Sequence, residues 1–415
     1  MRRTLIITVL LLTVAAVQPQ YEMPLCTCRA DSISPKFESV QNDGRTPSTE
    51  APTEIPDEIL IGYFGPDDVN HPEGGDMWCA ATLAIEQANK AGGYEGRPFK
   101  LITGWSENPW GSGVTDVARM AYQHNVLAII GGIDGPSTHL AEQVVAKARL
   151  PLLSGGNADR TANLANVSWM FCSLPGHHLQ AAALAEAVEA LIAGGRLVVV
   201  STVDHDSHVL SVEIEKCFHK RQIAPRYHFH FECGQSDNSE LVNRIVKANA
   251  KAVVIIAPLR DSAQMCVDLR SKGFDGAIFG GPCMSRRMLV DTAGDAVEGT
   301  VFPVLYKPSE GSRAFEQAFF NHFRRHGDYL SAHTYDTVNI LVEAIRRAGL
   351  DRERIRDEIR KLSPYSGVTG TICWDKRGSN CRRISTGTIS NGRVRILGPH
   401  HSITYSSTAP STPPQ

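Results

Sequence analysis

Residues 59–64 read ILIGYF, an almost unbroken apolar run, and residues 76–93 read DMWCAATLAIEQANKAGG. The first string predicts a strand that is buried on both faces. In the second string apolar residues recur at helical spacing, which predicts a helix over residues 76–90 that ends at Gly92 and Gly93. A buried strand followed by such a helix is the repeating unit of an α/β fold with a parallel sheet.

The same unit recurs along the chain in two series. The order predicts two doubly wound parallel-sheet lobes of the α/β class. The first series has strands expected at residues 59–64, 99–103, 127–131 and 150–153, with further helices near 114–123 and 137–148. The second series has strands expected at residues 197–200, 227–231, 252–256 and 277–280.

After a strand near residues 300–305 the chain is expected to be helical to about residue 362 and to end in short strands around 371–373 and 384–396. A chain that visits each lobe more than once forms several crossing strands. This predicts a multi-strand hinge with a ligand cleft between the lobes.

Both ends of the chain lack this pattern. Residues 1–20 begin with two arginines and continue as a short apolar run, the layout of a secretory signal peptide, with an uncleaved membrane anchor as the alternative. Residues 21–57 and 399–415 are rich in Ser, Pro and Thr, so we expect a disordered tether and a disordered tail. The protein is therefore expected to be exported and to be periplasmic or secreted.

Charge and cysteine content narrow the class of protein. The 42 Lys and Arg residues nearly balance the 44 Asp and Glu residues, which argues against a nucleic-acid partner. Ten cysteines in an exported chain permit disulfides, and Cys373 and Cys381 can bridge if their strands pair as a hairpin. Cys26 and Cys28 follow Leu and Thr rather than a small residue, so we favour a protein without a lipid anchor.

Several strings in collinear order resemble the leucine/isoleucine/valine-binding protein family. They are residues 61–66 (IGYFGP), 84–97 (AIEQANKAGGYEGR), 129–132 (IIGG), 150–154 (LPLLS), 332–339 (AHTYDTVN) and 367–372 (GVTGTI). The resemblance covers roughly residues 58–397 and implies a type I periplasmic binding fold. It implies that lobe one comprises residues 58–174 plus 305–365 and that lobe two comprises residues 175–304 plus 366–398.

The resemblance also implies a function. A protein of this family captures a small polar ligand between its lobes, here expected to be an amino acid of the branched-chain type or a related amide, and delivers it to an ABC permease in the membrane. The alternative is a periplasmic ligand-sensing module that signals to a partner protein.

In lobe one the resemblance places candidate ligand contacts in two loops. Residues 134–138 match the loop whose backbone amides and serine hydroxyl hold the ligand carboxylate, so Asp134, Gly135 and Ser137 are candidates. Pro136 lacks an N–H group, Asp134 would repel an anion, and the N-cap of a helix is the alternative role for Ser137.

The second loop of lobe one contributes Gly156 and Asn157. Glycine permits close approach of a ligand to the backbone, and the asparagine amide offers both a donor and an acceptor. Ala158 stands where the family usually places a threonine. An ordinary turn is the alternative role for this loop.

In lobe two, Asp206 stands roughly where the family places an aromatic ring, so its carboxylate is expected to pair with a ligand ammonium. The family acid that neutralises this ammonium corresponds to Cys283, a departure from the pattern. Arg260 either projects toward the cleft or is a solvated residue at a helix start. Trp105 and Trp110 either stack on the ligand or pack at the rim.

The histidines also offer candidate catalytic and metal-binding groups. His205 and His208 flank Asp206, and imidazole and carboxylate groups bind metals, but one loop supplies no distant third ligand. His228 and His230 alternate on one strand and share a face, which is typical of a solvent face. The sequence has no Gly-x-Ser-x-Gly elbow, His-Glu-x-x-His pair or Walker loop, so we expect neither an enzyme nor a cofactor.

Overall fold

The computed structural model describes residues 56–106, 112–192 and 196–398. The expected signal peptide, the tail, all but the last residues of the tether, and Trp110 lie outside these described residues. Within them, no helix combines the length and the apolar character needed to cross a membrane.

The first lobe is built on a six-stranded sheet whose pairings are all parallel. Its strands, in spatial order, are β13 (Ser379–Asn380), β5 (Met170–Pro175), β4 (Leu152–Ser154), β3 (Ile129–Gly131), β1 (Ile59–Phe64) and β2 (Phe99–Gly104). Its helical elements are α1 (Gly75–Lys90), α2 (Val114–Tyr122), α3 (Gly135–Ala148), the 3-10 turn η2 (Arg160–Asn163), α9 (Arg313–Phe323), α10 (Tyr329–Ala348) and α11 (Arg352–Lys361).

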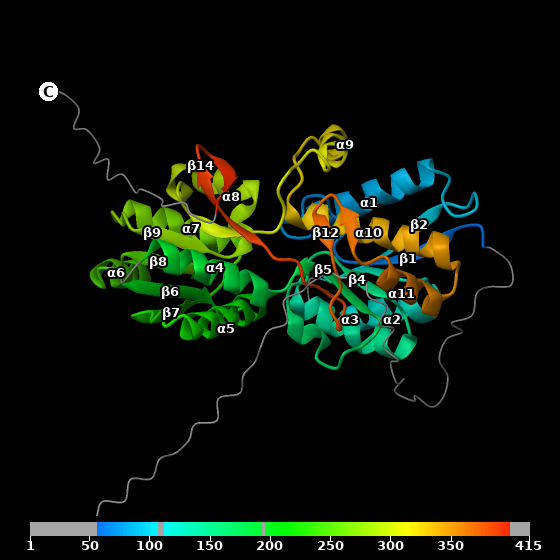
Figure 1. Cartoon of the computed structure of the whole chain (residues 1–415), viewed down its shortest axis with the longest axis horizontal. Coiled ribbons are helices and arrows are strands. Elements are labelled where there is room, and N and C mark those ends of the chain that lie inside the picture. Colours follow the sequence, from blue (N-terminus) through cyan, green and yellow to red (C-terminus); the bar gives the residue numbers. More distant parts are fainter. Residues whose placement is uncertain (1–55, 107–111, 193–195, 399–415) are drawn as a thin grey trace, which may run out of the picture. The chain divides into compact units, whose positions relative to one another are not determined.

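Helices cover both faces of this sheet (Figure 1). Alternate residues of β1 explain why: Ile59, Ile61 and Tyr63 pack against α1 and α10, whereas Phe64 packs on the opposite side against α2 and α3. A strand buried on both faces cannot alternate apolar and polar residues, which is why residues 59–64 form an apolar run.

The second lobe is built on a seven-stranded sheet. Its strands, in spatial order, are β15 (Arg393–Ile396), β14 (Ser385–Ser390), β10 (Val301–Val304), β9 (Ala277–Gly280), β8 (Ala252–Ile256), β6 (Leu197–Thr202) and β7 (Tyr227–Phe231). Its helical elements are α4 (His177–Leu191), α5 (His205–Lys220), α6 (Ser239–Lys247), α7 (Leu259–Ser271), η3 (Pro282–Ser285), α8 (Arg287–Ala293) and η4 (Gly294–Val297). Only β14 pairs antiparallel, with β10 on one side and β15 on the other.

Both lobes share one strand order. Neighbouring strands run β2-β1-β3-β4-β5 in the first sheet and β7-β6-β8-β9-β10 in the second, which is a doubly wound arrangement. The chain passes from one sheet to the other after β5, after β10 and before β14. The fold class expected from the sequence, two α/β lobes with parallel sheets, is confirmed.

The C-terminal segment divides differently from the expectation. Placing all of residues 366–398 in lobe two is wrong for residues 366–380, because β13 pairs with β5 of the first sheet. The preceding hairpin of β11 (Tyr365–Gly367) and β12 (Gly370–Ile372) is also fixed to lobe one. The buried carboxylate of Asp336 on α10 accepts hydrogen bonds from the N–H groups of Val368 and Thr369, at 2.7 and 2.9 Å. Only β14 and β15 join lobe two.

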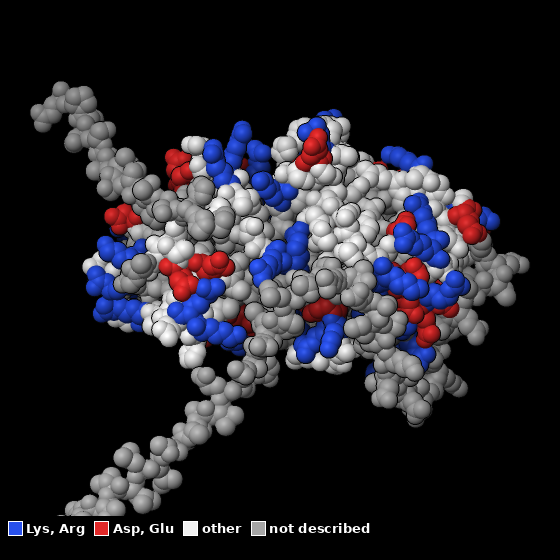
Figure 2. Space-filling view, viewed as in Figure 1, with Lys and Arg blue, Asp and Glu red and all other residues white. Residues whose placement is uncertain are grey.

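Two other sequence expectations concern the surface and the cysteines. On the face shown in Figure 2, basic and acidic side chains are interspersed over both lobes, in keeping with the near-neutral charge.

The N–H group of Cys381 donates to the carbonyl oxygen of Cys373 at 3.0 Å, so the two residues lie next to each other across their turn. A disulfide between them stays a prediction.

Candidate ligand-binding site

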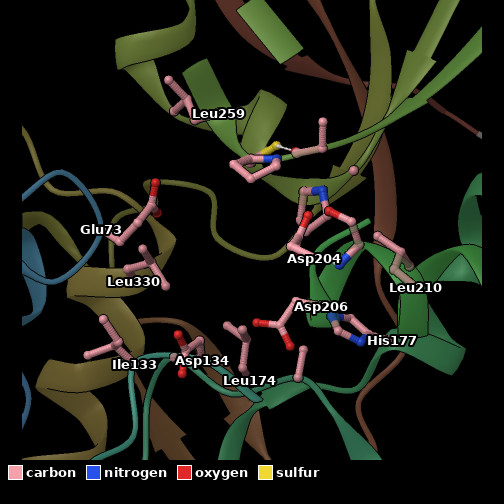
Figure 3. Close-up of a pocket in the computed structure, with 18 of the residues that line it drawn as sticks. Glu73, Ile133, Asp134, Leu174, His177, Asp204, Asp206, Leu210, Leu259 and Leu330 are labelled. Carbon is pink, nitrogen blue, oxygen red and sulfur yellow. Dashed lines mark hydrogen bonds between the residues drawn. The ribbon is translucent and has the colours of Figure 1, made fainter. Parts of the chain in front are cut away.

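The loops at the carboxyl ends of the central strands line one cavity of about 380 Å³ (Figure 3). In lobe one they follow β1, β3 and β4, and in lobe two they follow β6, β8 and β9. The strand order reverses direction between β1 and β3 and again between β6 and β8. Loops diverge at such a point and leave a crevice, which is where open α/β sheets bind ligands.

The lining of the cavity combines apolar side chains with acidic ones. Apolar side chains include Ile133, Leu174, Leu210, Ile256 and Leu330. Four carboxylates also line it, those of Glu73, Asp134, Asp204 and Asp206, of which Glu73 is paired with Arg286 at 2.8 Å. The described lining residues themselves include no Lys or Arg. The cavity therefore favours a positively charged group over an anion.

Asp134 and Ser137 form a capping box at the start of α3. Asp134 is the N-cap, and its Oδ1 accepts hydrogen bonds from both the N–H group and the hydroxyl of Ser137, at 2.8 and 2.5 Å. The alternative role expected for Ser137, that of the N-cap, is therefore wrong: Asp134 is the N-cap, and Ser137 is the third residue of α3. Its side chain is fully buried and is engaged by Asp134.

Asp204 has the corresponding role in lobe two. It is the N-cap of α5 and accepts hydrogen bonds from the N–H group of Ser207 at 3.0 Å and from the hydroxyl of Thr202 at 2.6 Å. Burial tends to raise the pKa of Asp204, but these hydrogen bonds outweigh it and lower the pKa overall. Asp204 therefore contributes a fixed negative charge to the cavity.

Asp206 reaches from α5 across to lobe one. Both of its carboxylate oxygens accept from the N–H group of Gly135, the first residue of α3, at 3.2 and 3.1 Å. Burial, and then the nearby carboxylate of Asp134, raise the pKa of Asp206 to about 7. Figure 3 shows its side chain near Asp134 and Leu174, inside the cavity.

Two glycines allow the close approaches on which this site depends. A Cβ atom at Gly135 would lie 2.4 Å from Oδ1 of Asp206, so a side chain there would displace the carboxylate of Asp206. A Cβ atom at Gly156 would lie 2.6 Å from the carbonyl oxygen of Ile133. Gly156 lines the cavity, as does the adjacent Ala158.

Asn157 supports the neighbouring loop and is not among the lining residues. Its side chain is 1% exposed, and its Oδ1 accepts the N–H group of Asp159 at 2.8 Å. The residue therefore fixes the turn that carries Asp159, as expected from the alternative role of this loop.

The remaining predicted positions differ in how they meet the cavity. Cys283 lines it, and burial raises the pKa of its thiol to about 12, so it adds no charge. Trp105 also lines it and packs against Phe64, with ring centroids 5.5 Å apart. Arg260 is exposed on α7 and is not among the lining residues, which fits the solvated alternative.

Several lining residues were missed by the sequence reasoning. Glu73 lies in the irregular loop after β1, and His177 and Gln180 begin α4. Nδ1 of His177 and Oε1 of Gln180 are buried without a hydrogen-bond partner among the described residues. Burial lowers the pKa of His177 to about 4, so its ring is neutral at pH 7. Of these three residues, only Glu73 has a sequence feature that indicates a place at the cavity, because it lies in the loop that follows β1.

Comparison with known proteins gives a consistent result. The profile of the periplasmic binding protein family matches residues 60–391. An amino acid binding protein of Pseudomonas aeruginosa is 22% identical over 327 residues, which cover 77% of this chain and 87% of the relative.

Solved structures agree with this match at the level of the fold. The substrate-binding protein of a branched-chain amino acid transporter from Streptococcus pneumoniae, solved with isoleucine, has a TM-score of 0.74 and 20% identity and covers 82% of this chain and 100% of its own. A leucine-binding protein of Thermotoga maritima has a TM-score of 0.73 and 22% identity and covers 82% of this chain and 98% of its own. Both are described as binding proteins.

Proposed function

Since this chain belongs to the periplasmic binding protein family, whose members bind solutes and are not enzymes, we propose that it captures a small solute with an ammonium group in the cavity of Figure 3. The solute also carries a compact apolar part and needs no free carboxylate. It is thus an amine or an amide related to a branched-chain amino acid.

The contact between Asp206 and Gly135 carries this proposal. The first N–H group of α3 is the kind of donor that an amino-acid carboxylate seeks at a helix N-terminus, but Asp206 already accepts it. Ser137 is likewise engaged by Asp134. With these donors taken by carboxylates of the chain itself, a ligand carboxylate would be repelled by the acidic side chains that line the cavity.

The other lining groups suit the remaining parts of such a solute. The leucine and isoleucine side chains of the wall match a short branched alkyl group, whose burial is favourable in proportion to its area. His177, whose ring is neutral at pH 7, and Gln180 line the cavity from α4, so they add polar groups to the wall without adding charge.

We extend the proposal to the place of action, outside the cytoplasm, with delivery of the solute to an ABC permease. Its support is that structural relatives are described as substrate-binding proteins of ABC transporters. Genes for a permease and an ATPase beside this one would support delivery, whereas an adjacent histidine kinase gene would favour the sensing alternative.

Calorimetric titration with four solutes that share an isobutyl group tests the ligand class. Leucine carries both charges, and leucinamide and 3-methylbutylamine carry only the ammonium. Isovalerate, a five-carbon counterpart of 3-methylbutylamine, carries only a carboxylate. We expect leucinamide and 3-methylbutylamine to bind at least as tightly as leucine does. We expect no binding of isovalerate. Binding of isovalerate, or of leucine but neither amine, would overturn the proposal.

Two variants locate the binding. Asp206→Asn removes the charge and keeps the shape of the side chain, and we expect it to weaken amine binding by about tenfold or more, as for a charge-assisted hydrogen bond. Arg260→Ala is the matched control, because Arg260 is exposed on α7 and is not among the lining residues. Equal loss in both variants would argue against this cavity.

A further inference from the structure

Three side chains from separate segments meet beside the cavity. His139 lies on α3 and Asp159 precedes η2, both in lobe one, whereas His205 is the first residue of α5 in lobe two. Nε2 of His139 lies 3.1 Å and Nε2 of His205 lies 2.8 Å from the same oxygen, Oδ2 of Asp159. The three ligand atoms all lie within 4.8 Å of one another. Helices α3 and α5 are in contact here.

From this geometry we propose that His139, Asp159 and His205 form a binding site for a zinc-class divalent cation between the two lobes. Two imidazole nitrogens and one carboxylate oxygen are a donor set that Zn²⁺ accepts, with a fourth position for water. The side chain of His205 is 40% exposed and that of His139 26% exposed, so water can reach the site.

The distances fit the size of such an ion. Metal bonds of about 2.0–2.1 Å in a tetrahedral site place neighbouring ligand atoms about 3.3 Å apart. The two nitrogen–oxygen distances, 3.1 and 2.8 Å, are shorter than this by a few tenths of an ångström. The two Nε2 atoms lie within 4.8 Å of each other, so the imidazole rings would turn toward each other to bind one ion.

The hydrogen bonding of Asp159 also favours a cation. Oδ2 of Asp159 also accepts a hydrogen bond from the hydroxyl of Thr161 at 2.7 Å. Two imidazole nitrogens and one hydroxyl thus lie within hydrogen-bond distance of one oxygen, and the side chain of Asp159 is fully buried. One ion that binds both Nε2 atoms and Oδ2 satisfies both imidazoles without requiring protons on these nitrogens, while the Thr161 hydroxyl still donates to Oδ2.

Further residues hold the ligands in place, as outer groups do in metal sites. The N–H group of Thr161 donates to Oδ1 of Asp159 at 2.7 Å, and Asn157 fixes the backbone of the same turn. Oε2 of Glu142 lies 4.0 Å from Nδ1 of His139, on the opposite side of the ring from Asp159.

Because the ligands come from both lobes, all three can bind one ion only while the lobes are together. By linkage, any solute that binds the same closed state must raise the affinity for the ion, and the ion must raise the affinity for the solute. This coupling rests on the proposed function, whereas the metal site does not.

Calorimetric titration of the full chain, without a histidine tag, with Zn²⁺ at pH 7 tests the site. We expect one tight Zn²⁺ per chain and no comparable binding of Mg²⁺, which prefers oxygen ligands. His139→Ala, Asp159→Asn and His205→Ala should each weaken Zn²⁺ binding by about a hundredfold. Melting temperatures without metal show that each variant is folded.

Three control variants remove other donors. His208→Ala removes an exposed imidazole three residues further along α5, His228→Ala removes one ring of the adjacent pair on β7, and Cys233→Ser removes an exposed thiol. We expect all three to bind Zn²⁺ as the wild type does. Absence of tight Zn²⁺ binding, which would leave a hydrogen-bonded cluster only, or binding unchanged by His205→Ala, would overturn the assignment.

A final titration separates this inference from the proposed function. Zn²⁺ should tighten the binding of 3-methylbutylamine to the wild type but not to His205→Ala. If Zn²⁺ binds through the three residues and no amine binds, the metal site stands and the proposed ligand class fails.

Discussion

Asp206 reaches from α5 to the N–H group of Gly135, and burial together with the carboxylate of Asp134 raises its pKa to about 7. Only the ionised form attracts an ammonium group. The charge that the cavity offers to a ligand therefore changes near neutral pH.

This predicts a pH dependence of amine binding. Below pH 7 Asp206 is mostly protonated, so the affinity for 3-methylbutylamine should rise as pH increases, by up to about tenfold per unit, and level off above pH 7. Asp206→Asn should remove this slope. Calorimetry between pH 5.5 and 8 measures it, and a flat profile in the wild type would contradict the assignment.

Gly135 is the second residue whose size matters. In Gly135→Ala the new Cβ would lie 2.4 Å from Oδ1 of Asp206, so we expect weaker solute binding by about tenfold with little change in melting temperature. Gly311→Ala is the control, since its nearest contact would be an ordinary 3.7 Å to Ser309. Wild-type affinity in Gly135→Ala would show that binding does not depend on this position of the Asp206 carboxylate.

For single residues, the sequence predicts which of them lie at the cavity better than it predicts what each of them does there. Asp134, Gly135, Gly156 and Asp206 follow strand ends, where the cavity forms, and all four are at the site. Ser137 was harder to interpret, because capping a helix and binding a ligand use the same hydroxyl and the same N–H groups.

Among the elements, α10 carries a buried histidine that links stability to pH. His333 is fully buried, lies with Nε2 3.3 Å from the carbonyl oxygen of Leu305, and has its pKa lowered to about 3 by burial. In the unfolded chain the ring takes up a proton near pH 6.5. Between these values the unfolded state binds more protons than the folded state.

Stability should therefore fall as pH drops from 6.5 toward 4, with His333 contributing about 3 kcal/mol to the loss. Urea unfolding of the wild type and His333→Gln at both pH values measures this contribution. Between the two pH values the unfolding free energy of His333→Gln should fall clearly less than that of the wild type. The exposed control His322→Gln should show the same fall as the wild type. Equal losses in all three proteins would rule out His333 as the source.

The elements with a strong apolar pattern were predicted closely, and the weak ones were not. Strands β8 and β9 occupy the residues expected from their apolar runs. β13 has only Ser379 and Asn380, which carry no strand signal, and its pairing with β5 depends on the hairpin that precedes it. The division of residues 366–398 between the lobes was missed for this reason.

For the whole molecule, the order of elements predicts two lobes and a cleft, but not every group that meets there. Glu73 comes from a loop without periodicity, and His139, Asp159 and His205 come from three separate segments. Such contacts depend on how the two sheets face each other, which no local pattern contains.

Arg286 joins the lobes at another point. It precedes α8 in lobe two, is 2% exposed, and meets carboxylates of lobe one: Glu73 at 2.8 Å, Asp328 at 2.6 Å and Asp76 at 3.7 Å. Removing one partner of a buried ion pair leaves the others without compensation.

Arg286→Met should therefore lower the free energy of unfolding by about 3 to 5 kcal/mol. The neighbouring Arg287→Met is the control, because Arg287 is 70% exposed and pairs only loosely with Asp291 at 3.9 Å. Urea unfolding compares the two variants. A loss no larger than that of the control would mean that this cluster does not stabilise the contact between the lobes.

The crystal structure of the full chain with 3-methylbutylamine tests the central claim most directly. The amine should lie in the cavity, its nitrogen within hydrogen-bond distance of Asp206 and its methyl groups against Leu174, Leu210 and Leu330. An amine bound outside this cavity, or inside it with the nitrogen directed away from the carboxylates, would contradict the account.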